Sequence, residues 1–156
     1  MNSQLELRAL VRAGAQYLNG TFKSERHFLD FVVDGQSLWE VLGSRHDMVS
    51  VLCVEYAKDE ITKAVGRLLL EEKADLPNDR RSLFVCSECG DLGCGAITAV
   101  VERRDGNFRW STFGYENNYL PGVSLDAYNV VGPFTFDAVR YESTLRQAIP
   151  LKRADV

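Results

Sequence analysis

The sequence predicts a single α+β domain in which a mixed or mainly antiparallel sheet carries two or three packed helices. Three observations support this fold class. Short apolar runs bounded by turn signals crowd the second half of the chain, as is typical of strands joined by hairpins. One segment has the 3.6-residue period of an amphipathic helix. No low-complexity linker or internal repeat divides residues 1–156, a length that suits one domain with its own core.

Strands are expected at three places in the first half. Residues 4–10 alternate apolar and polar side chains, which indicates a strand, although a helix that continues to Tyr17 is the alternative. Residues 27–33 are apolar and rich in aromatic and β-branched side chains, and a turn signal follows them. Residues 48–54 form another apolar run. This run is too short for its period to decide, and we interpret it as a strand.

Two helices are also expected in the first half. Ser37 and Glu40 have the spacing of a capping box, in which the Ser37 hydroxyl accepts an amide hydrogen of the first turn and Glu40 reaches back to the cap amide. That helix is short, and Gly43 is expected to end it. The second helix carries one apolar stripe at helical spacing, formed by Ile61, Ala64, Val65, Leu68 and Leu69.

The second half predicts four strands and a last helix. The strands are expected at residues 82–86, 96–102, 108–115 and 134–136. Asp105-Gly106 favours a tight hairpin between the second and third of them, because this pair tolerates the positive φ of a type I′ turn. Asp137 is expected to cap the helix, and Phe136 and Tyr141 have the spacing of a hydrophobic staple around it.

Charge and composition limit the classes of partner. The formal net charge is −4 and the Lys and Arg residues are scattered, whereas phosphate contacts need clustered cations, so no nucleic-acid partner is expected. No run approaches the roughly 18 apolar residues of a membrane helix, and no secretory signal is found. We therefore expect a cytoplasmic protein without a membrane partner, in which cysteines are reduced thiols or metal ligands.

The cysteine turn, defined as residues 86–95, is the segment with the most evident chemistry. Cys86 and Cys89 are two residues apart and a glycine follows, which is the arrangement of a zinc knuckle. Cys94 would be a third zinc ligand. The fourth would come from Cys53, His27 or His46. Zinc is the one cofactor that the sequence suggests.

Two other interpretations of the cysteine turn remain open. The first, which we favour over zinc, makes Cys86 and Cys94 small buried residues at the ends of two adjacent strands. In the second, Cys86 and Cys89 form the dithiol of an oxidoreductase. A dithiol of that kind usually begins a helix, whose dipole lowers the thiol pKa, whereas here a glycine-rich segment leads into a strand.

The string ECGDLGCGA at residues 88–96 resembles the signature of a family of small bacterial proteins. The resemblance continues at Trp110, in FGYENNY at residues 113–119, at residues 132–134 and 136–137, and at Tyr141, and more loosely at residues 33–35 and 37–38. It implies that the cysteine turn and residues 113–119 pack together. It implies no particular reaction.

A non-enzymatic binding protein is the function that the sequence favours, because it contains no complete set of catalytic groups at recognisable spacing. By analogy of size and charge with immunity proteins, we expect a toxin as the protein partner. An acidic surface would complement a basic toxin. The partner-binding residues are expected to be Asp91, Glu116, Asn117, Asn118, Tyr119 and Asp126.

Overall fold

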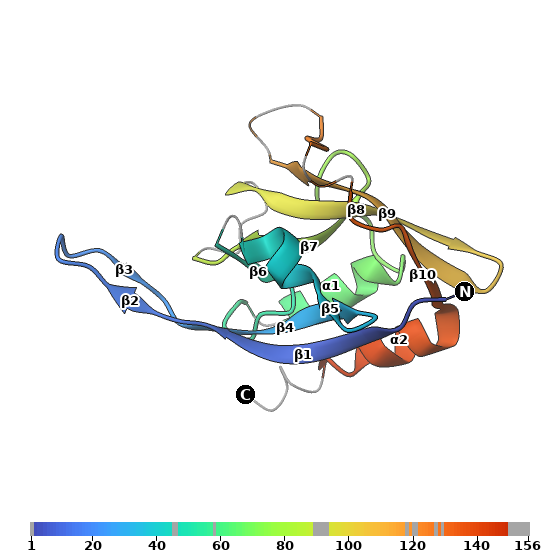
Figure 1. Cartoon of the computed structure of the whole chain (residues 1–156), viewed down its shortest axis with the longest axis horizontal. Coiled ribbons are helices and arrows are strands. Elements are labelled where there is room, and N and C mark those ends of the chain that lie inside the picture. The colour runs from blue at the N-terminus through green and yellow to red at the C-terminus, as the bar shows by residue number, and fades with distance from the viewer. Residues whose placement is uncertain are drawn as a thin grey trace.

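The computed structural model describes residues 2–44, 47–57, 59–88, 94–117, 119, 122–126, 128 and 130–149. Within these ranges, ten strands and three helices form an α+β fold whose sheets are antiparallel, which confirms the predicted fold class. Figure 1 shows a larger sheet above a smaller one, with a two-stranded arm extending from one end of the molecule.

The larger sheet has five strands in the order β10, β9, β8, β7, β6. Their bounds are Phe134–Asp137 for β10, Asn107–Glu116 for β9, Ala96–Arg104 for β8, Arg81–Cys86 for β7 and Met48–Ser50 for β6. The predicted hairpin between β8 and β9 is confirmed, since Asp105 and Gly106 have positive φ angles of 54° and 78°. This turn suits the twist of the strands and keeps β8 and β9 paired as far as Arg104.

The smaller sheet shows that the segment near the N-terminus, predicted as a strand or alternatively a helix, is a strand. Its strands, in the order β1, β4, β5, span Leu5–Arg12, Arg26–Val33 and Gln36–Ser37. β1 and β4 pair without interruption, from Leu5 opposite Val33 to Arg12 opposite Arg26. Residues 28–33 of β4 are buried, and β1 pairs along the whole length of this strand. The strand interpretation is therefore confirmed and the alternative helix is absent here.

The run 48–54 joins the two sheets instead of forming one strand as expected. Its first part is β6, which pairs with β7. Its second part turns to β4: the amide of Leu29 donates to the carbonyl of Leu52 at 3.1 Å, and the amide of Val54 donates to the carbonyl of His27 at 2.9 Å. The two sheets also meet near the N-terminus, where the Ser3 amide donates to the carbonyl of Thr135 in β10 at 2.7 Å. The strands thus encircle the core.

The expected capped helix forms as a short π-helical turn, η1, over Trp39–Gly43. Its cap is as predicted in one respect, because the Ser37 hydroxyl accepts a hydrogen bond from the Glu40 amide at 3.1 Å. Gly43 is its last residue for a reason of packing. A Cβ atom there would lie 2.9 Å from the ring of Phe84, so only glycine allows the turn to approach β7 so closely.

Both predicted α-helices are present. α1 spans Glu60–Leu68 and buries its apolar stripe in the main core. α2 spans Ala138–Arg146; the Asp137 carboxylate caps its first turn, and the stacked rings of Phe136 and Tyr141, 5.4 Å apart, form the predicted staple. Within the described residues, no helix has the length and apolar character needed to cross a membrane.

A hydrogen-bonded aromatic chain occupies the centre of the core. Trp110 of β9 is fully buried, and its Nε1 donates to the Tyr141 hydroxyl at 2.9 Å. That hydroxyl donates in turn to the carbonyl of Leu68 at 2.7 Å. Burial raises the pKa of Tyr141, so the hydroxyl stays neutral and keeps its proton for this bond. These two hydrogen bonds thereby connect β9, α2 and α1 at the centre of the core.

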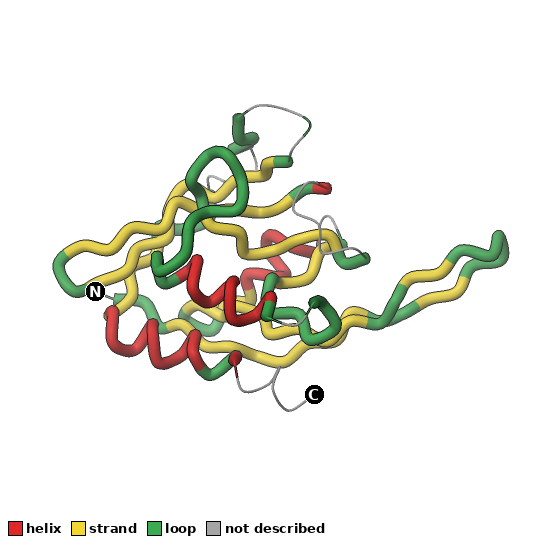
Figure 2. Tube along the Cα trace, turned by 180° about the vertical axis from the view of Figure 1, so that it is seen from behind, coloured by secondary structure: helices red, strands yellow, loops and turns green. Residues whose placement is uncertain are grey.

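The arm, residues 13–25, is a feature that we did not expect from the sequence. It contains β2 (Ala15–Gln16) and β3 (Phe22–Lys23), which continue the β1–β4 ribbon beyond the body of the protein. Figures 1 and 2 both show it extending away from the two sheets. Asn19-Gly20 at its tip is a hairpin signal, and Gly20 has a φ of 87°.

Candidate functional site

The connection from β9 to β10 holds most of the predicted partner-binding residues and is anchored at its root. Tyr115 and Ser124 exchange two backbone hydrogen bonds, with N–O distances of 2.9 and 2.8 Å. Tyr128 is 7% exposed, and its carbonyl accepts from the Val131 amide at 3.1 Å. The chain therefore doubles back on β9 and is held a second time before β10.

Glu116 is the last residue of β9 and is only 2% exposed. Its Oε2 accepts a 2.6 Å hydrogen bond from the Thr98 hydroxyl and lies 3.4 Å from Nε of Arg80. Its Oε1 accepts from the Asn78 amide at 3.0 Å. The expectation that Glu116 is exposed to a partner is therefore wrong, because its carboxylate compensates a buried guanidinium.

Other side chains of the connection are exposed. Tyr119 and Val130 are 78% and 80% exposed, Leu125 is at the border of exposure at 36%, and Asp126 is exposed. Asn117 is half-buried, and its Oδ1 accepts from the Tyr119 amide at 2.9 Å. We call these five residues the loop surface. The predicted contact residues Asp91 and Asn118 lie outside the described residues.

Strands β7 and β8 bring both ends of the cysteine turn together. Val85 is the register partner of Ala96, so Cys86 and Cys94 lie close to this pair, at opposite ends of the connecting segment. Cys86 is partly exposed and Cys94 is exposed, so the expectation that both are buried is wrong. The Tyr115 hydroxyl donates to the Cys94 carbonyl at 3.3 Å, which places Cys94 beside β9.

A metal site is not visible in the part of the chain that the structure describes, where no three His, Cys, Asp or Glu side chains are arranged to hold an ion. Cys89 and His46 lie outside that part, so the zinc site stays a prediction. Cys53 is buried, and burial raises its pKa to about 12. His27 lies 2.7 Å from Glu55 and 3.3 Å from Glu25.

An ion-pair cluster at the base of the arm was not expected from the sequence. Arg12 is 5% exposed and donates to both carboxylate oxygens of Asp47, at 3.1 and 2.7 Å. It also donates to the Ser24 carbonyl at 2.6 Å and to Glu88 of the cysteine turn at 2.9 Å. Lys23 lies 2.9 Å from Asp47. No local pattern marks these residues, which meet only after folding.

The charged groups of this cluster shift one another's pKa values. Hydrogen bonds from Arg12 hold the pKa of Asp47 below its usual range, and burial opposes this only in part. The same guanidinium is the main cause of a lowered pKa at Glu88. The arm, the segment before β6 and the cysteine turn are therefore joined by ionised groups at neutral pH.

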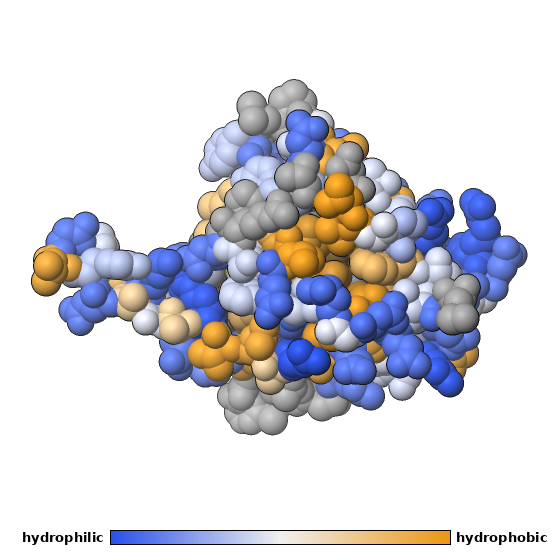
Figure 3. Space-filling model, viewed as in Figure 1, coloured by the Kyte–Doolittle hydropathy of each residue, from blue (hydrophilic) through white to orange (hydrophobic). Residues whose placement is uncertain are grey.

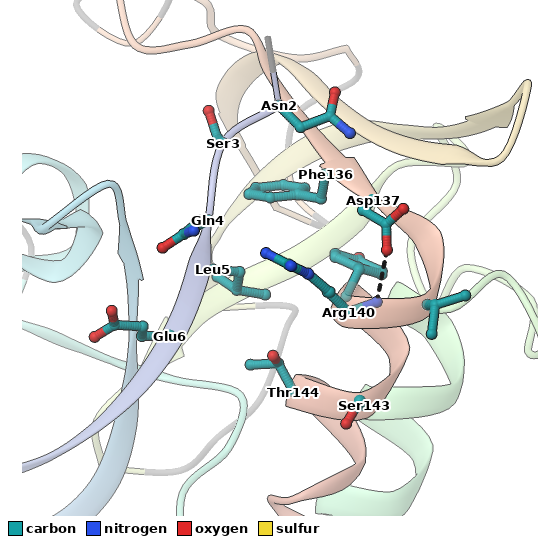
Figure 4. A pocket seen from close by; sticks show the side chains of 12 residues that line it. Asn2, Ser3, Gln4, Leu5, Glu6, Phe136, Asp137, Arg140, Ser143 and Thr144 are labelled. Atoms are coloured by element: carbon teal, nitrogen blue, oxygen red, sulfur yellow. Dashed lines mark hydrogen bonds between the residues drawn. The ribbon is translucent and has the colours of Figure 1, made fainter.

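A cleft of about 680 Å³ lies at the end of the molecule remote from the arm. Residues 2–6, the end of β10 and α2 line it, with Leu5, Phe136 and Tyr141 among the lining residues. Figure 4 shows Arg140 reaching from α2 into the cleft, while Glu6 points away from it. The sequence did not indicate this cleft, because its walls come from both ends of the chain.

Comparison with known proteins adds no candidate. No family model, no curated protein and no solved structure matches this chain.

Proposed function

We propose that this protein is a non-enzymatic binding protein that docks on a protein partner through the loop surface and neutralises it, as an immunity protein does with a toxin. The observation that carries the proposal is the exposure of Tyr119 and Val130, 78% and 80%, beside the exposed Asp126. Aromatic and aliphatic anchors within a polar surrounding are what protein interfaces use for affinity.

The anchored root of the loop surface supports this role. A loop that must be ordered on binding loses free energy of association for each immobilised residue. Here the Tyr115–Ser124 backbone pair and the buried Glu116 order the root before a partner arrives. Less ordering is left for the moment of binding, so a contact area of given size yields tighter association.

Charge supports a basic partner. The chain has a formal net charge of −4, and Asp126 places one exposed carboxylate within the loop surface. Complementary potential speeds association and selects among partners more than it adds affinity. A basic toxin domain, such as a nuclease that binds phosphate, has that complementary charge.

The test is calorimetric titration of this protein with a purified basic toxin domain, to be sought among the reading frames next to its gene. We expect Tyr119→Ala and Val130→Asp each to raise the dissociation constant at least about tenfold, equal to about 1.4 kcal/mol. Val139→Asp is the matched control, because Val139 is 78% exposed on α2, outside the loop surface. Binding that the loop variants and the control weaken equally, or no binding at all, would contradict the proposal.

Zinc binding by the cysteine turn is the second candidate, favoured by the β7–β8 register that brings Cys86 and Cys94 to neighbouring strand ends. Elemental analysis should then find about one zinc per chain, and Cys86→Ser should abolish it. Protein that is well folded without metal and takes up none would exclude this function. A dithiol function of Cys86 and Cys89 remains a prediction that reversible oxidation would test.

A further inference from the structure

The arm concentrates exposed apolar surface on a short projecting element. Half of the large apolar side chains that are exposed in the described residues lie on it or at its base; they are Val11 (57%), Tyr17 (45%), Leu18 (109%) and Phe22 (69%). Figure 3 shows apolar surface at the far end of the arm. Apolar side chains gathered on a projecting tip are typical of an interaction site, because their burial against another surface removes them from water.

The tip of the arm has a defined conformation. The Tyr17 amide donates to the Thr21 carbonyl at 2.8 Å, and Asn19 Oδ1 accepts from both the amide and the hydroxyl of Thr21, at 3.0 and 2.6 Å. The base is held as well, because Arg26 donates to the carbonyls of Ser87 and Glu88 at 2.7 and 2.8 Å. The arm is thus pre-organised for docking.

Among the described residues, no further strand pairs with the outer edges of β2 and β3. β2 and β3 form a two-stranded sheet in which, among the described residues, each strand pairs only with the other. An isolated two-stranded ribbon is marginally stable in water, and its outer N–H and C=O groups can pair with another strand. Edges of this kind are commonly protected by charges or proline. Residues 13–22 contain neither, and Lys23, the one charged residue of β2 and β3, is paired with Asp47.

We propose that the arm is a self-association element that pairs with the arm of a second copy of this chain. Charge favours this occupant over a basic protein. Residues 13–22 carry no charged side chain, so they offer nothing to a partner selected by opposite charge, whereas two copies of this uncharged stretch can meet without repulsion. A two-fold contact through one edge of the arm is self-complementary and closes on itself, which gives a dimer.

The size of the arm sets the strength of this contact. A standard interface uses about 20–30 residues from each partner, more than the stretch 13–25 provides. The acidic bodies also repel each other weakly. The dimer is therefore weak and reversible, with a dissociation constant on the order of 10 µM.

Sedimentation equilibrium of the purified full chain, from about 1 to about 500 µM, tests the proposal. The mass should rise from 17.5 kDa toward twice that value. Leu18→Asp and Phe22→Asp place a like charge on both arms and should each weaken association at least about tenfold. Val139→Asp, on a side chain as exposed as these, should leave it unchanged. A chain that stays monomeric throughout, or a dimer that tolerates both arm variants, would overturn the proposal.

Two further readouts locate the contact. Amide hydrogen exchange should slow with rising protein concentration in β2 and β3, and not in the loop surface. Raising salt from about 0.05 to about 0.5 M should leave the dimer intact or tighten it, since salt screens the repulsion between the bodies. Concentration-dependent protection elsewhere, or monomers that bind phosphatidylcholine vesicles through the arm without dimerising, would count against self-association. None of these measurements requires the toxin domain.

Discussion

At the scale of residues, the buried Arg80–Glu116 pair supports the root of the loop surface without being part of that surface. Arg80 donates to the carbonyls of Thr98 and Thr112, and the β8–β9 register shifts beside both of them. Thr112 has a positive φ of 54°, a conformation that non-glycine residues rarely adopt. The guanidinium therefore donates to two carbonyls at this irregularity, and Glu116 neutralises the guanidinium.

Removing Glu116 should be strongly destabilising. In Glu116→Ala the guanidinium of Arg80, 6% exposed, stays buried without its carboxylate, which costs about 3–5 kcal/mol of unfolding free energy. Urea denaturation measures the loss. Glu102→Ala is the control, because Glu102 is exposed on the same sheet, and its effect should stay within about 0.5 kcal/mol. Equal effects of the two substitutions would show that the buried pair contributes nothing specific.

At the scale of elements, the arm is held by ion pairs at its base, and acid should weaken them. A carboxyl group whose pKa is lowered by folding stabilises the fold at pH values above its ordinary pKa, about 4 for Asp. That contribution is lost as the pH falls through the lowered pKa. Asp47 and Glu88 both have lowered pKa values, so the base of the arm should loosen only below about pH 4.

An NMR titration of the Asp47 carboxyl tests this assignment. We expect a pKa below the ordinary value in the wild type and a return toward that value in Arg12→Met, because the guanidinium supplies the hydrogen bonds that lower it. Asp30 is an internal control with the opposite shift, since burial raises its pKa and Arg12 is not among the causes. An Asp47 pKa that Arg12→Met leaves in place would contradict the assignment.

At the scale of the whole molecule, the strands encircle a core to which the arm does not contribute. The main core cluster draws on both sheets, α1 and α2, and contains no residue between 13 and 25. Hydrogen bonds at Ser3 and at Leu29 connect the sheets at two places. The body should therefore fold without the arm.

Replacing residues 13–25 by Asn-Gly tests this independence. Arg12 and Arg26 are direct register partners, and an Asn-Gly type I′ turn can join antiparallel strands at such a pair. We expect a folded protein whose thermal midpoint lies within a few degrees of the wild type, about 1 kcal/mol or less. Near-ultraviolet circular dichroism of the buried Trp110 should be unchanged. Loss of that signal would mean that the arm is needed for folding.

The periodic elements were predictable because their signals are local. The stripe of α1, the Asp105-Gly106 turn and the Asp137 cap each depend on residues within a few positions of one another, and each appears where it was expected. The candidate partner-binding residues were predictable only in part. Tyr119 and Asp126 are exposed, but Glu116 is not, because its burial depends on Arg80, which lies 36 positions earlier in the chain.

The sequence by itself determined the fold class, the α-helices and the hairpin, since propensity, capping and turn chemistry act between near neighbours. Only the tertiary structure decided how the run 48–54 divides between β7 and β4, why Gly43 must lack a side chain, and which charges hold the arm. These outcomes depend on contacts between residues far apart in sequence. Apolar burial brings such residues together without regard to their spacing, so no local pattern records them.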